Sequence, residues 1–332
     1  MSTTDHDHHH HGDDHGHGHR HGGVDAAIAS SERGLWALKW SLVGLGLTAA
    51  LQVVVVIISG SVALLADTVH NFGDALSALP LAVAFVLSRR PPSPRFPFGL
   101  HRSEDLAGLA IVGLILFSAV FAAYESIQRL IDPQPINALG AVAIAGVIGF
   151  LGNEAVAVFR IRVGREIGSA ALIADGKHAR VDGLTSLAVV AGAAGVALGA
   201  PIADPIVGLL ISVAIFKIVW DAAQDIGERM LDGIDPAITD HIRSVATSVP
   251  GVLEVSDLRA RWLGHTIRAE VNATVGDELS ATQAHDVAVR VVRALREEVD
   301  FLDDAIVHVD PSSSSGEHHH EEEPVAVGAT PL

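Results

Sequence analysis

The chain has 332 residues, of which 49% are hydrophobic and 18% are charged, and its mean hydropathy is +0.39. This composition is too apolar for an ordinary soluble domain. The net charge of −17 argues against nucleic acid as a partner, because phosphate repels an acidic surface. With no cysteine, the chain offers neither disulfides nor thiolate metal ligands, so a metal ion would have to be held by imidazole and carboxylate groups.

The two ends of the chain are low in complexity. Residues 1–24 contain DHDHHHHGDDHGHGHRHGG, and residues 312–332 contain SSSSGEHHHEEE. Neither tract has an apolar face to bury, so both are predicted to be disordered, and no cleavable signal peptide is expected. The N-terminal tract could be a weak zinc collector or a solvated tail; we favour transient metal binding, because imidazole is the commonest metal ligand.

Six apolar stretches between residues 35 and 227 come close to the roughly 20 residues that a bilayer requires. Their approximate bounds are Leu35–Ile58, Val62–Leu87, Leu106–Tyr124, Ala138–Phe159, Ile173–Leu198 and Ile202–Trp220. Basic residues concentrate in the loops after the second and fourth stretches. The positive-inside rule therefore places these loops and both termini in the cytoplasm. The pattern predicts an integral α-helical membrane bundle of six transmembrane helices in the plasma membrane.

Residues 233–311 predict a soluble α+β domain. The expected elements are a helix from Pro236 to about Val249, strands at Val252–Trp262 and Thr266–Val275, a helix at Thr282–Val299, and a strand at Ala305–Val309. This ferredoxin-like α-β-β-α-β order suits two helices packed on one face of a three-stranded sheet.

Ionisable residues interrupt two of the apolar stretches at the same spacing. His70 and Asp74 stand four apart in LLADTVHNFGDAL, and His178 and Asp182 repeat that spacing in ADGKHARVDGLTSLAVV. Residues four apart share one helix face, with side chains about 5–6 Å apart. A charge in the bilayer costs at least about 2.5–3.5 kcal/mol, so such residues usually mark an ion path. Two such pairs suit a tetrahedral Zn²⁺ site of two imidazoles and two carboxylates, although one pair alone could be structural.

Taken together, these motifs resemble the cation diffusion facilitator family, in particular its bacterial zinc-type transporters. The resemblance covers nearly everything from Leu35 to Pro311 and also rests on FGLHRSEDLAGL, ADPIVGLLIS and VHVDP. It implies a homodimer embedded in the lipid bilayer, a metallochaperone-like cytoplasmic domain, and export of a divalent metal in exchange for protons. It further implies that the transport site consists of His70, Asp74, His178 and Asp182, and that a histidine at the first position goes with zinc.

Relatives in this family also bind zinc in the cytoplasmic domain. The matching residues here are His285, His308 and Asp310, whereas Ser256 and Glu270 stand where some relatives have histidine. His265 could substitute for a missing ligand. A rearranged metal site that includes His265 and Glu270 and a purely structural set of residues both stay open.

Two loop features complete the comparison with the family. The segment PPSPRFPFGLHRS has only His101 as a candidate ligand, so a second metal site found there in some relatives is not expected. Arg102 and Asp232 match positions that form a charge interlock between the membrane and cytoplasmic parts of some members. Arg102 would serve equally well as a positive-inside anchor.

The sequence leaves three alternatives to zinc export open. The cargo could be Cd²⁺, Co²⁺, Ni²⁺ or Fe²⁺, because ligand types alone rarely fix the metal. A membrane-embedded zinc hydrolase is less favoured, because a catalytic zinc keeps three protein ligands and an open water position. A metal sensor would leave the membrane pairs unexplained. We therefore predict a secondary active transporter rather than an enzyme.

Overall fold

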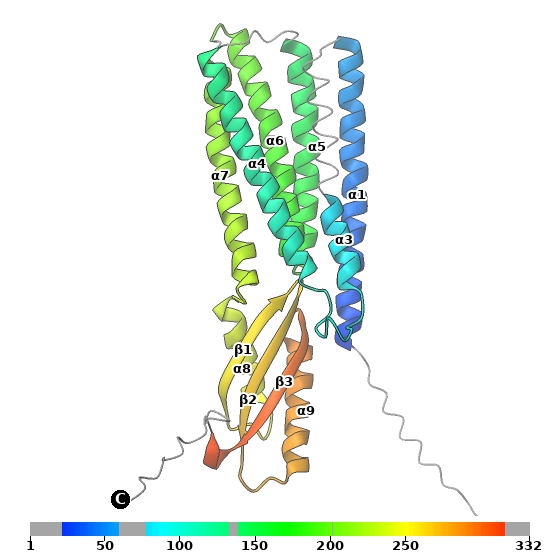
Figure 1. Ribbon diagram of the computed structural model, residues 1–332, viewed down its shortest axis with the longest axis vertical. Coiled ribbons are helices and arrows are strands. Elements are labelled where there is room, and N and C mark those ends of the chain that lie inside the picture. Colours follow the sequence, from blue (N-terminus) through cyan, green and yellow to red (C-terminus); the bar gives the residue numbers. More distant parts are fainter. Residues whose placement is uncertain (1–21, 60–77, 133–138, 201, 316–332) are drawn as a thin grey trace, which may run out of the picture.

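A computed structural model describes residues 22–59, 78–132, 139–200 and 202–315. Five long helices run side by side through one half of the molecule (Figure 1). They are α1 (Gly22–Ser59), α4 (Ser103–Ile131), α5 (Leu139–Glu166), α6 (Ala170–Ala197) and α7 (Ala203–Met230). A shorter apolar helix, α3 (Ala78–Ser88), packs against α1 and α4. Most of the second predicted span, including His70 and Asp74, lies outside the described residues.

The five long helices are long and apolar enough to cross a membrane, which confirms the predicted helical membrane bundle. Their inner faces build a core that includes Ile111, Ile115, Leu172 and Ile215. Their outer faces expose large apolar side chains such as Leu151, which is 60% exposed. A surface of this kind is stable against lipid and unfavourable in water.

The helices extend beyond the apolar stretches at the end nearest the C-terminal domain. α1 begins at Gly22, within the tract predicted to be disordered, and α7 continues to Met230 instead of ending near Trp220. Ion pairs join these polar extensions to neighbouring helices, as Arg33 does with Glu166 at 3.1 Å. Hydropathy detects the apolar part of a helix, whereas these contacts let the helix continue where hydropathy falls.

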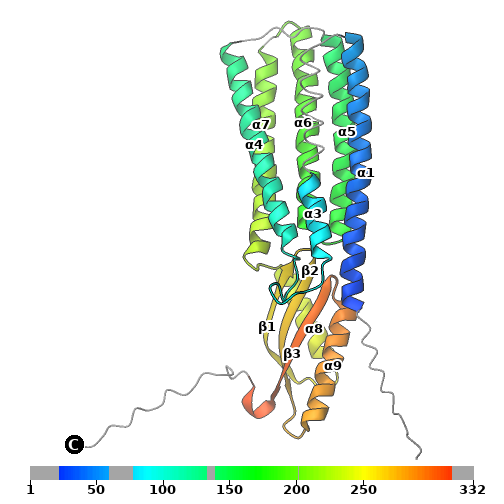
Figure 2. The same cartoon turned by 45° about the vertical axis from the view of Figure 1, so that its right-hand side comes forward.

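The C-terminal domain has the predicted α-β-β-α-β order. Its elements are α8 (Pro236–Ser248), β1 (Glu254–Leu263), β2 (Thr266–Val275), α9 (Ala281–Glu298) and β3 (Leu302–Pro311). The central strand β2 pairs antiparallel with β1 and parallel with β3. Figure 2 shows α8 and α9 on one face of this sheet. Alternate residues of β2, among them Ala269 and Val271, are buried, as the period of two in a strand requires.

Side-chain caps define where the two helices of this domain begin. The Asp235 carboxylate accepts a hydrogen bond from the amide of Ala237, and Pro236 occupies the first turn. Ser280 and Gln283 form a capping box at the start of α9. Each cap satisfies amide groups that the helix itself leaves without partners. The polar sequence signals therefore set the ends, and the apolar stripe sets the packed face.

The core of this domain predicts a large difference between two leucines. Leu295 on α9 is 0% exposed, whereas Leu253 before β1 is 61% exposed. Leu295→Ala should lower the free energy of unfolding of the domain by about 2–5 kcal/mol, because it leaves a cavity. Leu253→Ala is the control and should change it by less than about 0.5 kcal/mol. Urea unfolding of residues 233–315 followed by circular dichroism measures both; equal effects would contradict this packing.

Candidate metal transport site

Helix α6 positions the half of the predicted site that the structure describes. Nε2 of His178 lies 3.9 Å from Oδ2 of Asp182, one turn further along the helix. His178 is 1% exposed, and the side chain of Asp182 is 10% exposed. The helix begins at Ser169, whose hydroxyl accepts a hydrogen bond from the amide of Leu172. The joining of this pair with His70 and Asp74 stays a prediction, because those two residues lie outside the described ranges.

A cavity of about 500 Å³ between α4, α6 and α7 reaches Asp182. Its lining includes Phe117, Phe121 and two further carboxylates, Glu125 and Asp204. It lies toward the end of the bundle away from the C-terminal domain, where α4 ends and α7 begins (Figure 1). Ala197 at the end of α6 lies 15 positions after Asp182, a distance of about 22 Å along the helix. The cavity thus forms a vestibule that leads from the far end of the bundle to one predicted ligand.

Arg129 lies in the wall of this vestibule near the end of α4. Its guanidinium contacts Asp204 at 3.2 Å and Glu125 at 3.5 Å. The two carboxylates are therefore partly neutralised by one arginine. Among the described residues, Asp182 is the third carboxylate that lines the vestibule.

The basic residues of α5 and α6 make contacts that hydropathy does not predict. In the sequence they read as cytoplasmic loop charges, but Arg160 forms a buried ion pair with Asp175 at 2.9 Å. Arg180 donates two hydrogen bonds to Glu154, at 2.7 and 3.1 Å. One feature of the sequence could have indicated the first pair: Asp175 precedes His178 by three residues and so shares its helix face.

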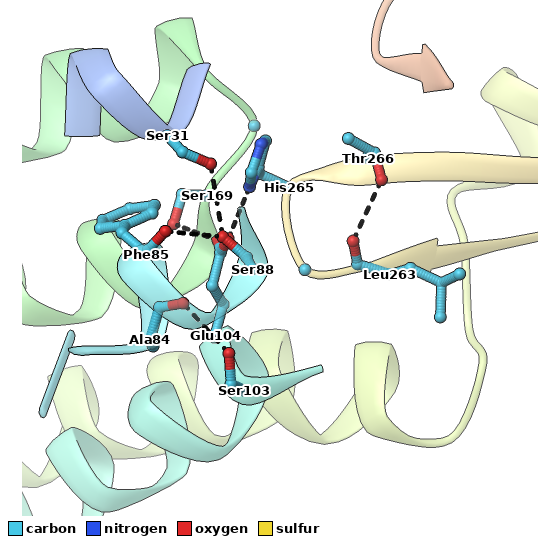
Figure 3. A network of polar contacts seen from close by, with 12 residues as sticks. Ser31, Ala84, Phe85, Ser88, Ser103, Glu104, Ser169, Leu263, His265 and Thr266 are labelled. Atoms are coloured by element: carbon cyan, nitrogen blue, oxygen red, sulfur yellow. Dashed lines mark hydrogen bonds and ion pairs between the residues drawn. The ribbon is translucent and has the colours of Figure 1, made fainter. Parts of the chain in front are cut away.

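The loop between β1 and β2 inserts into the base of the membrane bundle, as Figure 3 shows. Nδ1 of His265 lies 2.7 Å from Oε1 of Glu104, and both side chains are at most 2% exposed. When Glu104 is ionised, its carboxylate accepts this hydrogen bond from Nδ1–H of His265. The second oxygen of Glu104 lies 3.5 Å from the hydroxyl of Ser169, at the start of α6. His265 therefore belongs to the junction between the domains.

Close packing at this junction explains the glycine before His265. Gly264 has a φ of +62°, and a Cβ atom there would lie 2.7 Å from the backbone oxygen of His101. The pKa of His101 lies below its ordinary value because burial and the nearby His265 disfavour its charged form. Arg229 donates to the backbone oxygens of Gly168 and Gly264, at 2.8 and 3.1 Å, and its guanidinium stacks 4.0 Å from the ring centre of Trp262.

The predicted contact between Arg102 and Asp232 is present at the edge of this junction. Asp232 accepts hydrogen bonds from Arg102 and from Arg261, the latter at 3.3 Å. Partial desolvation alone would raise the pKa of Asp232, but the two guanidinium groups outweigh it and hold that pKa below its ordinary value. The group is largely exposed, so this interaction contributes little to stability.

The remaining candidate ligands are spread over the C-terminal domain. Nε2 of His308 lies 2.9 Å from Oδ1 of Asp310 on β3. His308 and the exposed Glu270 lie on the sheet face that α8 and α9 leave uncovered, since their strand neighbours Val271 and Val307 pack in the core. His285 belongs to α9, on the helical layer. Within the described ranges, no group of three or more histidine or acidic residues is arranged to hold a metal ion.

Comparison with known proteins gives two family matches. The cation efflux transmembrane domain matches residues 38–230, and the cytoplasmic domain of cation efflux proteins matches residues 234–312. The probable cation efflux system protein Rv2025c of Mycobacterium tuberculosis (strain ATCC 25618 / H37Rv) is 51% identical over 289 residues, 87% of each chain.

More distant relatives are also found. The manganese efflux system protein MneS of Bacillus subtilis (strain 168) is 25% identical over 265 residues, which cover 79% of this chain and 90% of that protein. The solved structure MamM-CTD 215-293 is 31% identical and covers 23% of this chain and 95% of that chain, with a TM-score of 0.22.

The two contacts that hold the junction predict unequal effects on stability. Glu104→Leu removes the acceptor of a buried histidine and should cost about 1–3 kcal/mol, because Nδ1–H is left without its partner. Asp232→Asn weakens exposed pairs and should cost less than about 1 kcal/mol. Thermal unfolding of the purified full chain, with trypsin cleavage near residue 233 as a second measurement, compares the two. A larger effect of Asp232→Asn would show that the exposed pairs dominate the junction.

Proposed function

We propose that this chain, which belongs to the cation efflux family and so is a transporter of divalent metal cations, exports Zn²⁺ from the cytoplasm in exchange for protons. The observation that carries the proposal is the pair His178 and Asp182, buried in an apolar bundle at the inner end of a vestibule. Ionisable groups in such a place are costly and are kept where an ion passes.

The ligand chemistry supports zinc. Neutral imidazole and carboxylate are both good ligands for Zn²⁺, and they favour four-coordinate geometry. If His70 and Asp74 complete the site, two carboxylates balance the charge of one divalent ion. A neutral loaded site avoids an uncompensated charge in a medium of low dielectric constant.

Protons are the natural counter-ions for this site. An imidazole titrates near pH 6.5, and a protonated imidazole cannot hold a metal ion. Protons that enter from the outer side through the vestibule would release Zn²⁺ there, and loss of the protons to the cytoplasm would restore the ligands. Access would alternate by movement of helices around the fixed site.

A second cargo has one specific observation in its favour. The relative MneS is a manganese efflux system protein. Mn²⁺ prefers oxygen ligands, whereas His178 supplies imidazole nitrogen beside Asp182, and nitrogen ligands favour Zn²⁺ over Mn²⁺. We therefore place Zn²⁺ before Mn²⁺ as cargo. Direct comparison of the two ions in one flux assay tests this order.

The open face of the C-terminal sheet supports a homodimer with a cytoplasmic metal site. Ile306 is 64% exposed on that face, on the edge strand β3 and next to Glu270 in register. The face that α8 and α9 leave uncovered is available to a second copy of the chain. His308 and Asp310 lie on the same strand, so a metal ion could be held there by residues of both copies.

The transport site is tested by substitution of its described ligands. Asp182→Ala and His178→Ala should each reduce Zn²⁺ flux into proteoliposomes to background, because each removes one ligand of the ion. The matched control is Asp240→Ala on the exposed surface of α8, which should leave the flux unchanged. If Asp182→Ala transports Zn²⁺ at the wild-type rate, Asp182 is not a ligand of the transported ion.

The cytoplasmic site is tested with zinc and the excised domain. Zinc at 100 times its Kd should stabilise residues 233–315 by about 2.7 kcal/mol and raise their melting temperature. His308→Ala should abolish the shift, and His241→Ala, on α8 at the surface, should preserve it. If the wild-type domain melts at the same temperature with and without zinc, these histidines are structural and do not bind the metal.

A further inference from the structure

The ligand-bearing face of α6 carries a third ionisable residue. Asp175 precedes His178 by three residues and Asp182 by seven, and this spacing places all three on one helix face. Asp175 lies one turn nearer the C-terminal domain than His178. In the transport path it would be an additional carboxylate on the cytoplasmic side of the ion.

Arg160 of α5 forms an ion pair with the carboxylate of Asp175. Its Nη1 lies 2.9 Å from Oδ2 of Asp175, and the two side chains are 1% and 0% exposed. In the part of the chain that the structure describes, neither carboxylate oxygen accepts a directional hydrogen bond, and Nε and Nη2 of Arg160 find no acceptor. Among the described residues, the attraction of the two charges therefore holds the pair, and each charge depends on the other for compensation.

Close packing of α5 and α6 keeps the pair dry. A Cβ atom at Gly176 would lie 3.0 Å from the backbone nitrogen of Ile161 and 3.1 Å from the backbone oxygen of Ala157. The glycine next to Asp175 therefore lets the two helices approach closely beside Arg160. In such a site charges are poorly screened, so the balance between Arg160 and Asp175 acts on a cation one turn away.

We propose that Arg160 determines the strength and selectivity of the transport site by neutralising Asp175. This inference rests on the proposed function. With Arg160 in place, only the carboxylates of the predicted ligands Asp74 and Asp182 balance the charge of an ion at His178. Without Arg160, the free carboxylate of Asp175 adds a negative charge and two oxygen atoms. The site would then bind divalent ions too tightly for rapid release. Its affinity would rise most for ions that prefer oxygen ligands, such as Mn²⁺.

An ion pair that only braced α5 against α6 would give a different result from the proposed role. The two roles differ in the direction in which two substitutions shift the half-saturating Zn²⁺ concentration. Arg160→Gln frees a negative charge and should lower the half-saturating Zn²⁺ concentration, with slower maximal flux. Asp175→Asn frees a positive charge and should raise the half-saturating concentration. For a brace, both substitutions loosen the same contact and shift transport in the same direction.

The experiment measures Zn²⁺ flux into proteoliposomes that contain the full chain, over a range of Zn²⁺ concentrations. Arg160→Gln is expected to lower the half-saturating concentration about tenfold, and Asp175→Asn to raise it about tenfold, by charge alone. The double variant Arg160→Gln/Asp175→Asn, which is neutral, should return near the wild-type value. Mn²⁺ flux relative to Zn²⁺ should rise in Arg160→Gln only. The control is Arg162→Gln, an exposed arginine of the same helix, which should leave all values unchanged.

Removal of one buried charge can prevent folding, so Arg160→Lys provides a second test. It keeps the positive charge that neutralises Asp175, so it should leave the half-saturating concentration near the wild-type value. A shift as large as that of Arg160→Gln would overturn the proposal, as would shifts of Arg160→Gln and Asp175→Asn in the same direction. Absence of Zn²⁺ flux in the wild-type protein, or wild-type flux in Asp182→Ala, would instead overturn the proposed function.

Discussion

Charges buried between apolar helices need partners, because neither lipid nor a packed helix interface can solvate them. This constraint organises the membrane half of the protein. Arg160 is buried against Asp175, and Arg180 holds Glu154 with two hydrogen bonds. Both pairs join α5 to α6, so the helix that carries His178 and Asp182 is tied to its neighbour close to the predicted ligands.

The same constraint shapes the boundary between the membrane bundle and the C-terminal domain. The buried contact between Glu104 and His265 links the start of α4 to the β1–β2 loop, and Ser169 connects it to the start of α6. Helix α4 also lines the vestibule, and α6 carries His178 and Asp182. A displacement of the C-terminal domain would therefore act directly on two helices that line the vestibule. The exposed pairs of Asp232 lie around this contact and are weaker because water screens them.

The predicted orientation in the membrane would place the vestibule on the side opposite the cytoplasm. The cavity lies toward the end of the bundle away from the C-terminal domain, and the dry Arg160–Asp175 pair lies on the side of His178 that faces the C-terminal domain. The arrangement in the structure is thus suited to exchange between Asp182 and the far side. An exporter needs such a state to release its ion, and it needs a second state in which helices part on the other side.

The class of protein and the local structure follow from the sequence alone. Long apolar stretches predict membrane helices because lipid cannot satisfy free backbone groups, and period-two and period-3.6 patterns locate β2 and α9 within a residue or two. The His178–Asp182 spacing is a property of one helix, so it too could be read directly. Contacts between distant segments could not, because no local pattern encodes them. Arg160 has the sequence context of a cytoplasmic anchor, and only the antiparallel register of α5 and α6 pairs it with Asp175. His265 is near the predicted cytoplasmic ligands in sequence, yet the fold buries it against Glu104, since packing of whole domains decides which side chains meet.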